Sequence, residues 1–192
     1  KDAIDDGVIL LEASLDASFI SYYENKAEYF SMIQNLKDRY SRKLHFRPEL
    51  GAARVLPEEK WEEWIRPAIN SGIFYSIDLY DLESVNKIHL YSKYYEIARN
   101  NGLKIKAHVG EFCDAEQIIE TIKILKPEAI QHGIQAIKSQ EAINLIKNRN
   151  ITLNICPTSN IKLGAIDSIT NHPAPNLYKE GINITINTDD LL

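Results

Sequence analysis

The feature that most constrains this chain is a regular alternation of short apolar segments with amphipathic ones. The apolar segments are often β-branched and apolar on both faces, as buried parallel strands are, and they cover residues 8–15, 43–46, 73–79, 103–108, 129–132, 151–156 and 182–187. Between them, apolar residues recur at helical spacing, as at Ile118, Ile119, Ile122 and Leu125. The alternation predicts an α/β fold with a parallel sheet and right-handed crossovers.

Two architectures fit this alternation: an open doubly wound sheet and a (β/α)8 barrel. No glycine-rich phosphate loop follows the first predicted strand, and polar clusters close several strands instead of gathering at one switch point. The clusters are His108-Val109-Gly110-Glu111, Gln131-His132-Gly133, Cys156-Pro157-Thr158-Ser159-Asn160 and Asn187-Thr188-Asp189-Asp190. Chemistry at the carboxyl ends of many strands is typical of a barrel, so we predict a (β/α)8 TIM barrel.

The predicted barrel is incomplete. A full barrel has eight strand–helix units in typically about 250 residues, whereas this chain has 192 residues. We therefore expect a single barrel domain over residues 1–192 that is one strand and one helix short. The chain begins at Lys1 without a Met and ends just after a predicted strand, so we expect a fragment of a longer chain.

Composition narrows the classes of function. The formal net charge of -5 gives no general attraction to nucleic acid or anionic membranes. No run approaches the roughly 18 apolar residues of a membrane span. The two cysteines, Cys113 and Cys156, lie in different segments, which favours a reduced, intracellular setting. We expect a cytoplasmic protein with a small-molecule partner and neither a nucleic acid nor a membrane as partner; the oligomeric state stays open.

The polar clusters carry the residue types of metal-assisted hydrolysis. His108 closes one predicted strand, Glu111 follows three residues later, and His132 closes the next strand. Asp189 and Asp190 end the last strand. Imidazole and carboxylate groups bind metal ions, a separate Glu transfers protons, and a bound metal lowers the pKa of its water to about 7. The pattern therefore predicts a metal-dependent hydrolase.

Together with Ile77-Asp78-Leu79, these clusters resemble the adenosine/AMP deaminase family in residues, order and separation, from the second strand to the eighth. The resemblance implies a barrel of the metal-dependent hydrolase type that contains strands 2 to 8 and lacks the first strand and the last helix. It also implies hydrolytic deamination of a 6-amino-purine nucleoside, adenosine to inosine and ammonia. The other zinc deaminase family needs His-x-Glu and Pro-Cys-x-x-Cys, and neither occurs here.

The resemblance implies a role for each matching residue. His108 and Asp189 would be ligands of one Zn²⁺ ion per active site. Glu111 would be the general acid/base that protonates the purine N1. His132 would orient the attacking hydroxide and stabilise charge at the tetrahedral centre. Asp190 would bind the purine N7, with two further substrate-binding positions at Gly110 and Asp81.

The chain departs from the family pattern at two places. The family's first strand ends in a His-x-His pair that supplies two zinc ligands, and no two histidines here stand two apart. A catalytic zinc normally has three protein ligands, so we expect this segment alone to bind zinc weakly and to lack deaminase activity. In addition, Asp81 occupies the position of a family glycine that lets the backbone approach the purine.

Two alternatives stay open for the function. The parent protein could deaminate another amino-purine, such as adenine, AMP or a modified adenosine. Alternatively, the chain could be a catalytically inactive fragment that lacks two zinc ligands, or a relative that lost its metal.

Other polar residues are expected to have supporting roles. We expect His45, at the end of the strand 43–46, to be structural and to face the same rim, with Arg47 and Glu49 as partners. We expect His89 and His172 at the surface. We expect Ser159 and Asn160 to shape the rim or to hydrogen-bond Asp189, with a purely structural role as the alternative.

Overall fold

A computed structural model describes residues 1–189 of the chain. These residues form two compact units, which we describe separately. Unit 1 comprises Lys1–Leu79 and Lys93–Lys104, and unit 2 comprises Tyr80–Ser92 and the residues from Ile105 onward. The single domain over residues 1–192 stays a prediction. The predicted substrate residue Asp190 lies outside the described residues.

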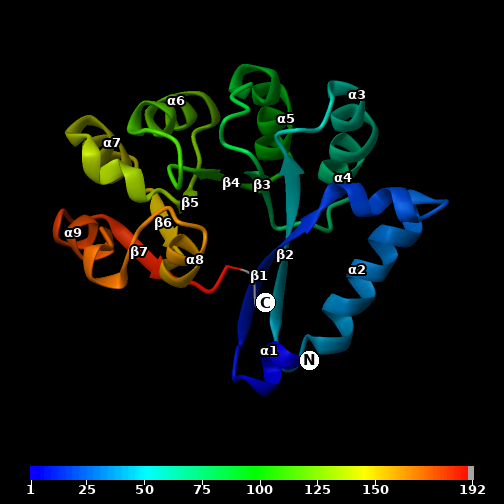
Figure 1. Ribbon diagram of the computed structural model, residues 1–192. Helices are drawn as coiled ribbons and strands as arrows, with labels where there is room; N and C mark the ends of the chain where they lie inside the picture. Colours follow the sequence, from blue (N-terminus) through cyan, green and yellow to red (C-terminus); the bar gives the residue numbers. More distant parts are fainter. Residues whose placement is uncertain (190–192) are drawn as a thin grey trace. The chain divides into compact units, whose positions relative to one another are not determined.

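Unit 1 contains three neighbouring strands and the helices that follow them (Figure 1). Its elements are α1 (Asp2–Asp5), β1 (Leu10–Asp16), a 3-10 helix (Ala17–Tyr22), α2 (Lys26–Tyr40), β2 (His45–Ala53), α3 (Glu58–Lys60), a π-helical turn (Trp61–Ile65), α4 (Arg66–Asn70) and β3 (Ser76–Tyr80), which ends in the first residue of unit 2. α5 (Ile88–Asn100) begins in unit 2 and continues in unit 1.

Strand β2 is longer than the sequence predicts. It pairs in parallel with β1 from Leu10 opposite His45 to Asp16 opposite Gly51. Local polarity suggests an end at Phe46, but Glu49 is buried inside the strand because its carboxylate accepts a hydrogen bond from the Ser76 hydroxyl at 2.8 Å. His45 therefore begins β2, and its predicted place at the carboxyl-end rim is wrong.

Unit 2 alternates short parallel strands with helices. Its elements are β4 (Lys104–Val109), whose first residue belongs to unit 1, α6 (Ala115–Leu125), β5 (Ala129–His132), a 3-10 helix (Ile134–Lys138), α7 (Gln140–Asn148), β6 (Thr152–Ile155), α8 (Pro157–Lys162), a 3-10 turn (Ile169–Asn171), α9 (Ala174–Lys179) and β7 (Asn183–Ile186). The strands lie in chain order, each parallel to the next. All seven predicted strands are thus present, although their ends differ by a few residues.

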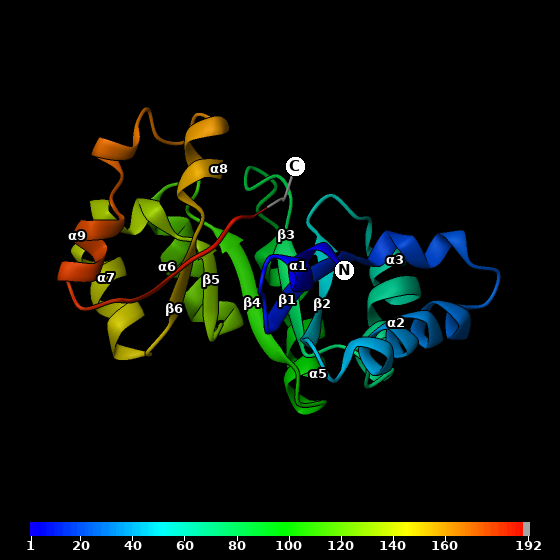
Figure 2. The same ribbon diagram turned by 90° about the horizontal axis from the view of Figure 1, so that it is seen from below.

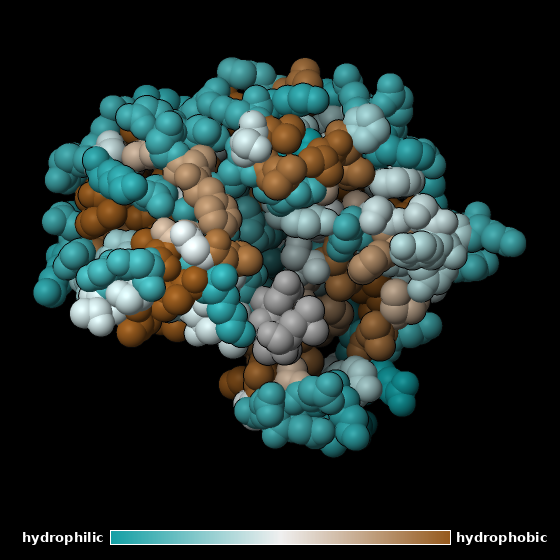
Figure 3. Space-filling view, in the orientation of Figure 1, coloured by the Kyte–Doolittle hydropathy of each residue, from teal (hydrophilic) through white to brown (hydrophobic). Residues whose placement is uncertain are grey.

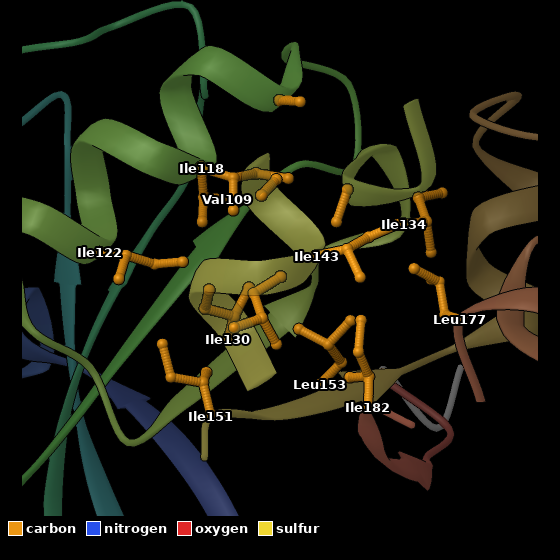
Figure 4. Packing of buried hydrophobic residues seen from close by; sticks show 14 of the residues in the cluster. Val109, Ile118, Ile122, Ile130, Ile134, Ile143, Ile151, Leu153, Leu177 and Ile182 are labelled. Atoms are coloured by element: carbon orange, nitrogen blue, oxygen red, sulfur yellow. The ribbon is translucent and has the colours of Figure 1, made fainter. Parts of the chain in front are cut away.

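The core of unit 2 joins the helices α6 and α7 to the strands. Seen from below, the two helices lie next to each other beside β5 and β6 (Figure 2). The apolar stripe predicted for α6 is buried and meets side chains of β5, β6 and α7, as Figure 4 shows; labelled members of this cluster include Ile118, Ile122, Ile130, Ile143 and Leu153. Each fully buried side chain of this kind contributes about 1.5–3 kcal/mol, so this core fixes the strand ends that carry the polar clusters.

Apolar side chains are also exposed around the last strand. Figure 3 shows apolar surface over the part of unit 2 that holds α8, α9 and β7. Its exposed members are Leu163, Ile169, Tyr178 and Ile186. Ile186 stands on β7, the last strand in the order, and is 66% exposed. Within the described residues, no helix is long and apolar enough to cross a membrane.

Candidate functional site

Three strand ends of unit 2 bring the predicted metal ligands and His132 together. β4 and β5 pair with His108 opposite Gln131 and Val109 opposite His132. The His108 and His132 rings therefore lie side by side, with centroids 5.3 Å apart. Asp189 follows β7, and its Oδ2 lies 3.9 Å from His132 Nε2. The three residues come from distant parts of the sequence, and parallel pairing places them at one edge.

This cluster fits a divalent metal ion. His108, His132 and Asp189 each offer one ligand atom, and these atoms all lie within 4.8 Å of one another. Ser159 Oγ donates a hydrogen bond to Asp189 Oδ2 at 2.6 Å, which confirms the predicted contact between these residues. Imidazole and carboxylate donors suit zinc and also iron. The chain therefore offers a donor set of the kind found at catalytic metal sites.

Three residues of this site have strained backbone conformations. Asp81, His132 and Asp189 have positive φ angles of 79°, 64° and 64°. Non-glycine residues adopt this conformation rarely, and it persists where the surrounding structure enforces it, often at functional sites. Asp81 thus has a backbone conformation that glycine adopts without strain, and its own carboxylate accepts a hydrogen bond from Leu82 N at 2.7 Å.

Glu111 is buried beside the cluster, with 7% of its surface exposed. Its Oε1 accepts a hydrogen bond from Asn160 Nδ2 at 2.6 Å and lies 3.6 Å from His132 Nδ1. Burial raises the pKa of the Glu111 carboxyl, and the charges of Asp189 and Glu83 raise it further. The Asn160 hydrogen bond and His108 lower it, but the net direction is upward. A raised pKa suits a carboxyl group that holds a proton near neutral pH.

The loop that carries Glu111 is held by Glu83, a residue that the sequence analysis did not single out. The buried Glu83 carboxylate accepts three backbone hydrogen bonds, from Glu111 N at 3.1 Å, Phe112 N at 2.8 Å and Cys113 N at 2.7 Å. On the other side, Gln135 Nε2 donates to Glu111 O at 3.1 Å. A carboxylate just beyond a buried strand, in the segment Tyr80-Asp81-Leu82-Glu83, is the signal that could have pointed to it.

Gly110 has a structural reason to be glycine. Its φ is +81°, and a Cβ there would meet Ile118 Cδ1 at 2.4 Å. Because a larger residue would be strained and would clash with α6, Gly110 fixes how closely the Glu111 loop packs on the core. Its predicted contact with the substrate stays a prediction.

A pocket of about 520 Å³ opens over these residues. This volume falls in the range of small-molecule sites, about 300–1,000 Å³. Four carboxylates line the pocket, and its described lining contains neither Lys nor Arg; the ionisable lining includes Asp81, Glu83, His108, Glu111, His132 and Asp189. Leu82 and Phe112, 59% and 57% exposed, add apolar surface at its mouth. The pocket thus pairs apolar contact surface with an acidic wall.

The other flagged residues divide into surface and buried groups. His89 is exposed, as predicted. His172 is buried with 5% of its surface exposed, so its predicted surface position is wrong. The reason is a hydrogen bond to buried Asn160, 12 residues away. No local sequence pattern predicts this contact. Burial and the charges of Asp189 and Glu111 raise the pKa of the Cys156 thiol to about 12, which disfavours a reactive thiolate.

Comparisons with known proteins point to one family of enzymes. The family model of adenosine deaminase matches residues 50–192. A protein of Treponema pallidum (strain Nichols), described as "Putative adenosine/adenine deaminase", is 35% identical over 193 residues, which cover 100% of this chain and 64% of that protein.

Solved structures show the same fold. An adenine deaminase of Arthrobacter aurescens superposes with a TM-score of 0.87 at 24% identity, and the N6-methyl-AMP deaminase of Arabidopsis thaliana with 0.83 at 26%. Each match covers 98% of this chain and 59% of the other protein, so the chain spans about three-fifths of their length. The predicted incomplete barrel of the metal-dependent hydrolase type is confirmed.

Proposed function

This chain belongs to the adenosine deaminase family, and we propose that it carries the proton-transfer and part of the metal-binding machinery of a hydrolytic amino-purine deaminase. The observation that carries the proposal is the buried Glu111 carboxyl beside the His108–His132–Asp189 cluster in one pocket. In the reaction, the oxygen of a water molecule replaces the amino group at C6 of adenosine. The products are inosine and ammonia.

The side chains support a division of labour. Glu111, with its raised pKa, would hold a proton for the purine N1 and pass a proton to the departing amine. His132 would stabilise the charge that develops on the oxygen at C6. Ser159 would hold the Asp189 carboxylate in place through its hydrogen bond.

His108 and Asp189 are the residues of this chain that would hold a zinc ion. Bound there, zinc would lower the pKa of a water molecule to about 7 and so supply hydroxide at neutral pH. Unlike the donors in the metal cluster, Glu111 lies outside the ligand set, which leaves its carboxyl free to exchange protons.

The pocket favours a substrate without phosphate. Asp81 and Glu83 add negative charge to the lining, and its described residues include no Lys or Arg, so the pocket would repel a phosphate group. Adenosine is therefore the first candidate. Adenine, which is smaller than adenosine, is the second candidate. Its support is Asp81, whose side chain takes up space at the position where the family has a glycine that lets the substrate approach the backbone.

A substrate panel tests the proposal on the full-length protein that contains this chain. Adenosine, adenine, AMP and N6-methyl-AMP are supplied in turn, and ammonia or methylamine release is measured. We expect turnover of adenosine or adenine well above that of both nucleotides, and its loss in Glu111→Gln. The same activity in the variant, or no release from any purine, contradicts the proposal.

A further inference from the structure

Two buried polar residues lie behind the pocket without lining it. Asn160, in α8, has 0% of its surface exposed, and His172, which follows the 3-10 turn Ile169–Asn171, has 5%. Asn160 Nδ2 contacts both Glu111 Oε1 at 2.6 Å and His132 Nδ1 at 3.1 Å. Asn160 Oδ1 lies 3.2 Å from His172 Nε2. The Asn160 amide therefore links the two residues predicted to catalyse the reaction, Glu111 and His132, to a third residue, His172.

The backbone decides which nitrogen of His172 carries the proton. Ala174 N lies 3.2 Å from His172 Nδ1, and a backbone N–H can only donate. His172 Nδ1 is therefore an acceptor, and the neutral ring carries its proton on Nε2. Burial lowers the pKa of His172, which agrees with a neutral ring.

The protonated His172 Nε2 in turn orients the Asn160 side chain. Since Nε2–H donates, the amide atom facing it must be the oxygen. With the amide reversed, His172 would need two acceptor nitrogens, which a neutral imidazole does not have. The Asn160 Nδ2 group must then face Glu111 and His132, and its two hydrogens reach one acceptor each.

The orientation of the Asn160 amide determines which ring nitrogen of His132 carries the proton. Asn160 Nδ2 only donates, so His132 Nδ1 accepts, and the neutral His132 ring carries its proton on Nε2. Nε2 is the atom that faces Asp189. A metal-binding imidazole usually donates its second ring N–H to a supporting acceptor, and here the second nitrogen accepts. In this form His132 presents an N–H to the pocket, so of the three clustered side chains His108 and Asp189 remain as the metal ligands.

We propose that His172 and Asn160 are positioning residues: through the chain Ala174 N–H, His172, Asn160, they hold the Glu111 carboxylate and keep His132 in the Nε2–H form. This assignment rests on the proposed function for its effect on catalysis, but not for the hydrogen-bond chain itself. Supporting residues of this kind typically change activity by about 10- to 100-fold when they are replaced.

Nitrogen NMR of the wild-type full-length protein with ¹⁵N-labelled histidine tests this series of hydrogen bonds directly. The spectra are recorded at about pH 8, above the ordinary His pKa of about 6.5. The signals are identified by the loss of each in His132→Gln and His172→Gln. We expect both rings to carry their proton on Nε2. A proton on Nδ1 of either ring overturns the proposal, whether or not the protein deaminates purines.

Paired variants separate positioning from packing. His172→Gln keeps an N–H donor for Asn160, His172→Leu removes it, and His89→Gln makes the same chemical change at an exposed site. We expect His172→Leu to lower kcat about 10- to 100-fold with KM little changed, His172→Gln to recover most of the loss, and His89→Gln to match wild type.

Equal kcat in His172→Leu and wild type, or equal losses in His172→Leu and His172→Gln, overturns the proposal. So does an unchanged Nε2–H signal of His132 in His172→Leu. Thermal unfolding shows whether His172→Leu is folded, and if it is not, the wild-type spectra decide the question alone.

Discussion

Glu83 gives the sharpest prediction about how the pocket is held. Its carboxylate is buried, with 8% of the residue surface exposed, and accepts hydrogen bonds from three consecutive backbone N–H groups. Glu111 N reaches one oxygen, and Phe112 N and Cys113 N reach the other. In Glu83→Gln, one oxygen becomes an NH₂ group, so at least one of these bonds is lost and a donor faces a donor.

The magnitude follows from that count. A hydrogen bond to a charged group contributes about 1.5–3 kcal/mol, so the free energy of unfolding should fall by at least about 1.5–3 kcal/mol in Glu83→Gln. If the amide oxygen takes the place that serves two N–H groups, Glu111 N loses its acceptor. The loop that carries Glu111 then loosens, and kcat should fall as well if Glu111 has the proposed role. Glu116→Gln, an exposed change on α6, is the matched control.

The pH dependence carries a sign that can be checked. Burial raises the pKa of the Glu83 carboxyl, but the N–H groups of Cys113, Glu111 and Phe112 together bring it below its ordinary value. A lowered folded-state pKa means that the carboxylate stabilises the fold above the unfolded-state pKa of about 4.3. This stabilisation is lost as the pH falls through the lower folded-state value.

Urea unfolding of the full-length wild type and Glu83→Gln between pH 7 and the acid limit tests this. The gap in unfolding free energy should be constant near neutral pH and shrink below about pH 4.3. A gap no larger than that of Glu116→Gln would show that Glu83 does not stabilise the fold through these bonds, and so would a gap that grows as the pH falls.

Three further predictions concern the same pocket. Glu111→Gln should lower kcat about 10²- to 10⁴-fold and leave the zinc content unchanged, as measured by steady-state kinetics and elemental analysis; a loss of zinc would instead make Glu111 part of the metal site. Gly110→Ala should lower the free energy of unfolding by about 1–3 kcal/mol, because φ is +81° and Cβ would meet Ile118; denaturant curves check this, and an unchanged midpoint contradicts it. Asp81→Gly should be tolerated, because glycine adopts a φ of 79° without strain, whereas Asp81→Val should destabilise by more than about 1 kcal/mol; equal stability of the two variants would rule out the strain.

The sequence predicts the fold well where the signal is local. The buried stripe of α6 and the short strands around it follow directly from apolar periodicity, since each stripe meets the same core. Prediction fails at β2, where polar residues suggest an early end. The strand continues because Glu49 accepts a hydrogen bond from the Ser76 hydroxyl, which lies 27 residues away in the sequence.

The same distinction applies to the site. His108, Glu111, His132 and Asp189 could be identified because each lies at or within three residues of the end of a strand, and parallel strands end at one edge. The Asn160–Glu111 contact joins residues 49 apart in the sequence, and the Asn160–His132 contact joins residues 28 apart. No local sequence pattern predicts these two contacts.

Glu83 and His172 were missed for a related reason. Their burial depends on hydrogen-bond donors and acceptors from other segments, Phe112 N for Glu83 and Asn160 for His172. Without those partners, a charged residue in a loop and a histidine before a proline both look like surface residues.

We infer that water replaces the amino group of a purine in this pocket. Deamination of adenosine by the full-length protein in ¹⁸O-labelled water tests it most directly, with mass spectrometry of the purine product. We predict one ¹⁸O atom at C6 for each ammonia released, and no labelled product from Glu111→Gln beyond a trace. Ammonia release without the label in the product, or no reaction with any amino-purine, would contradict the account.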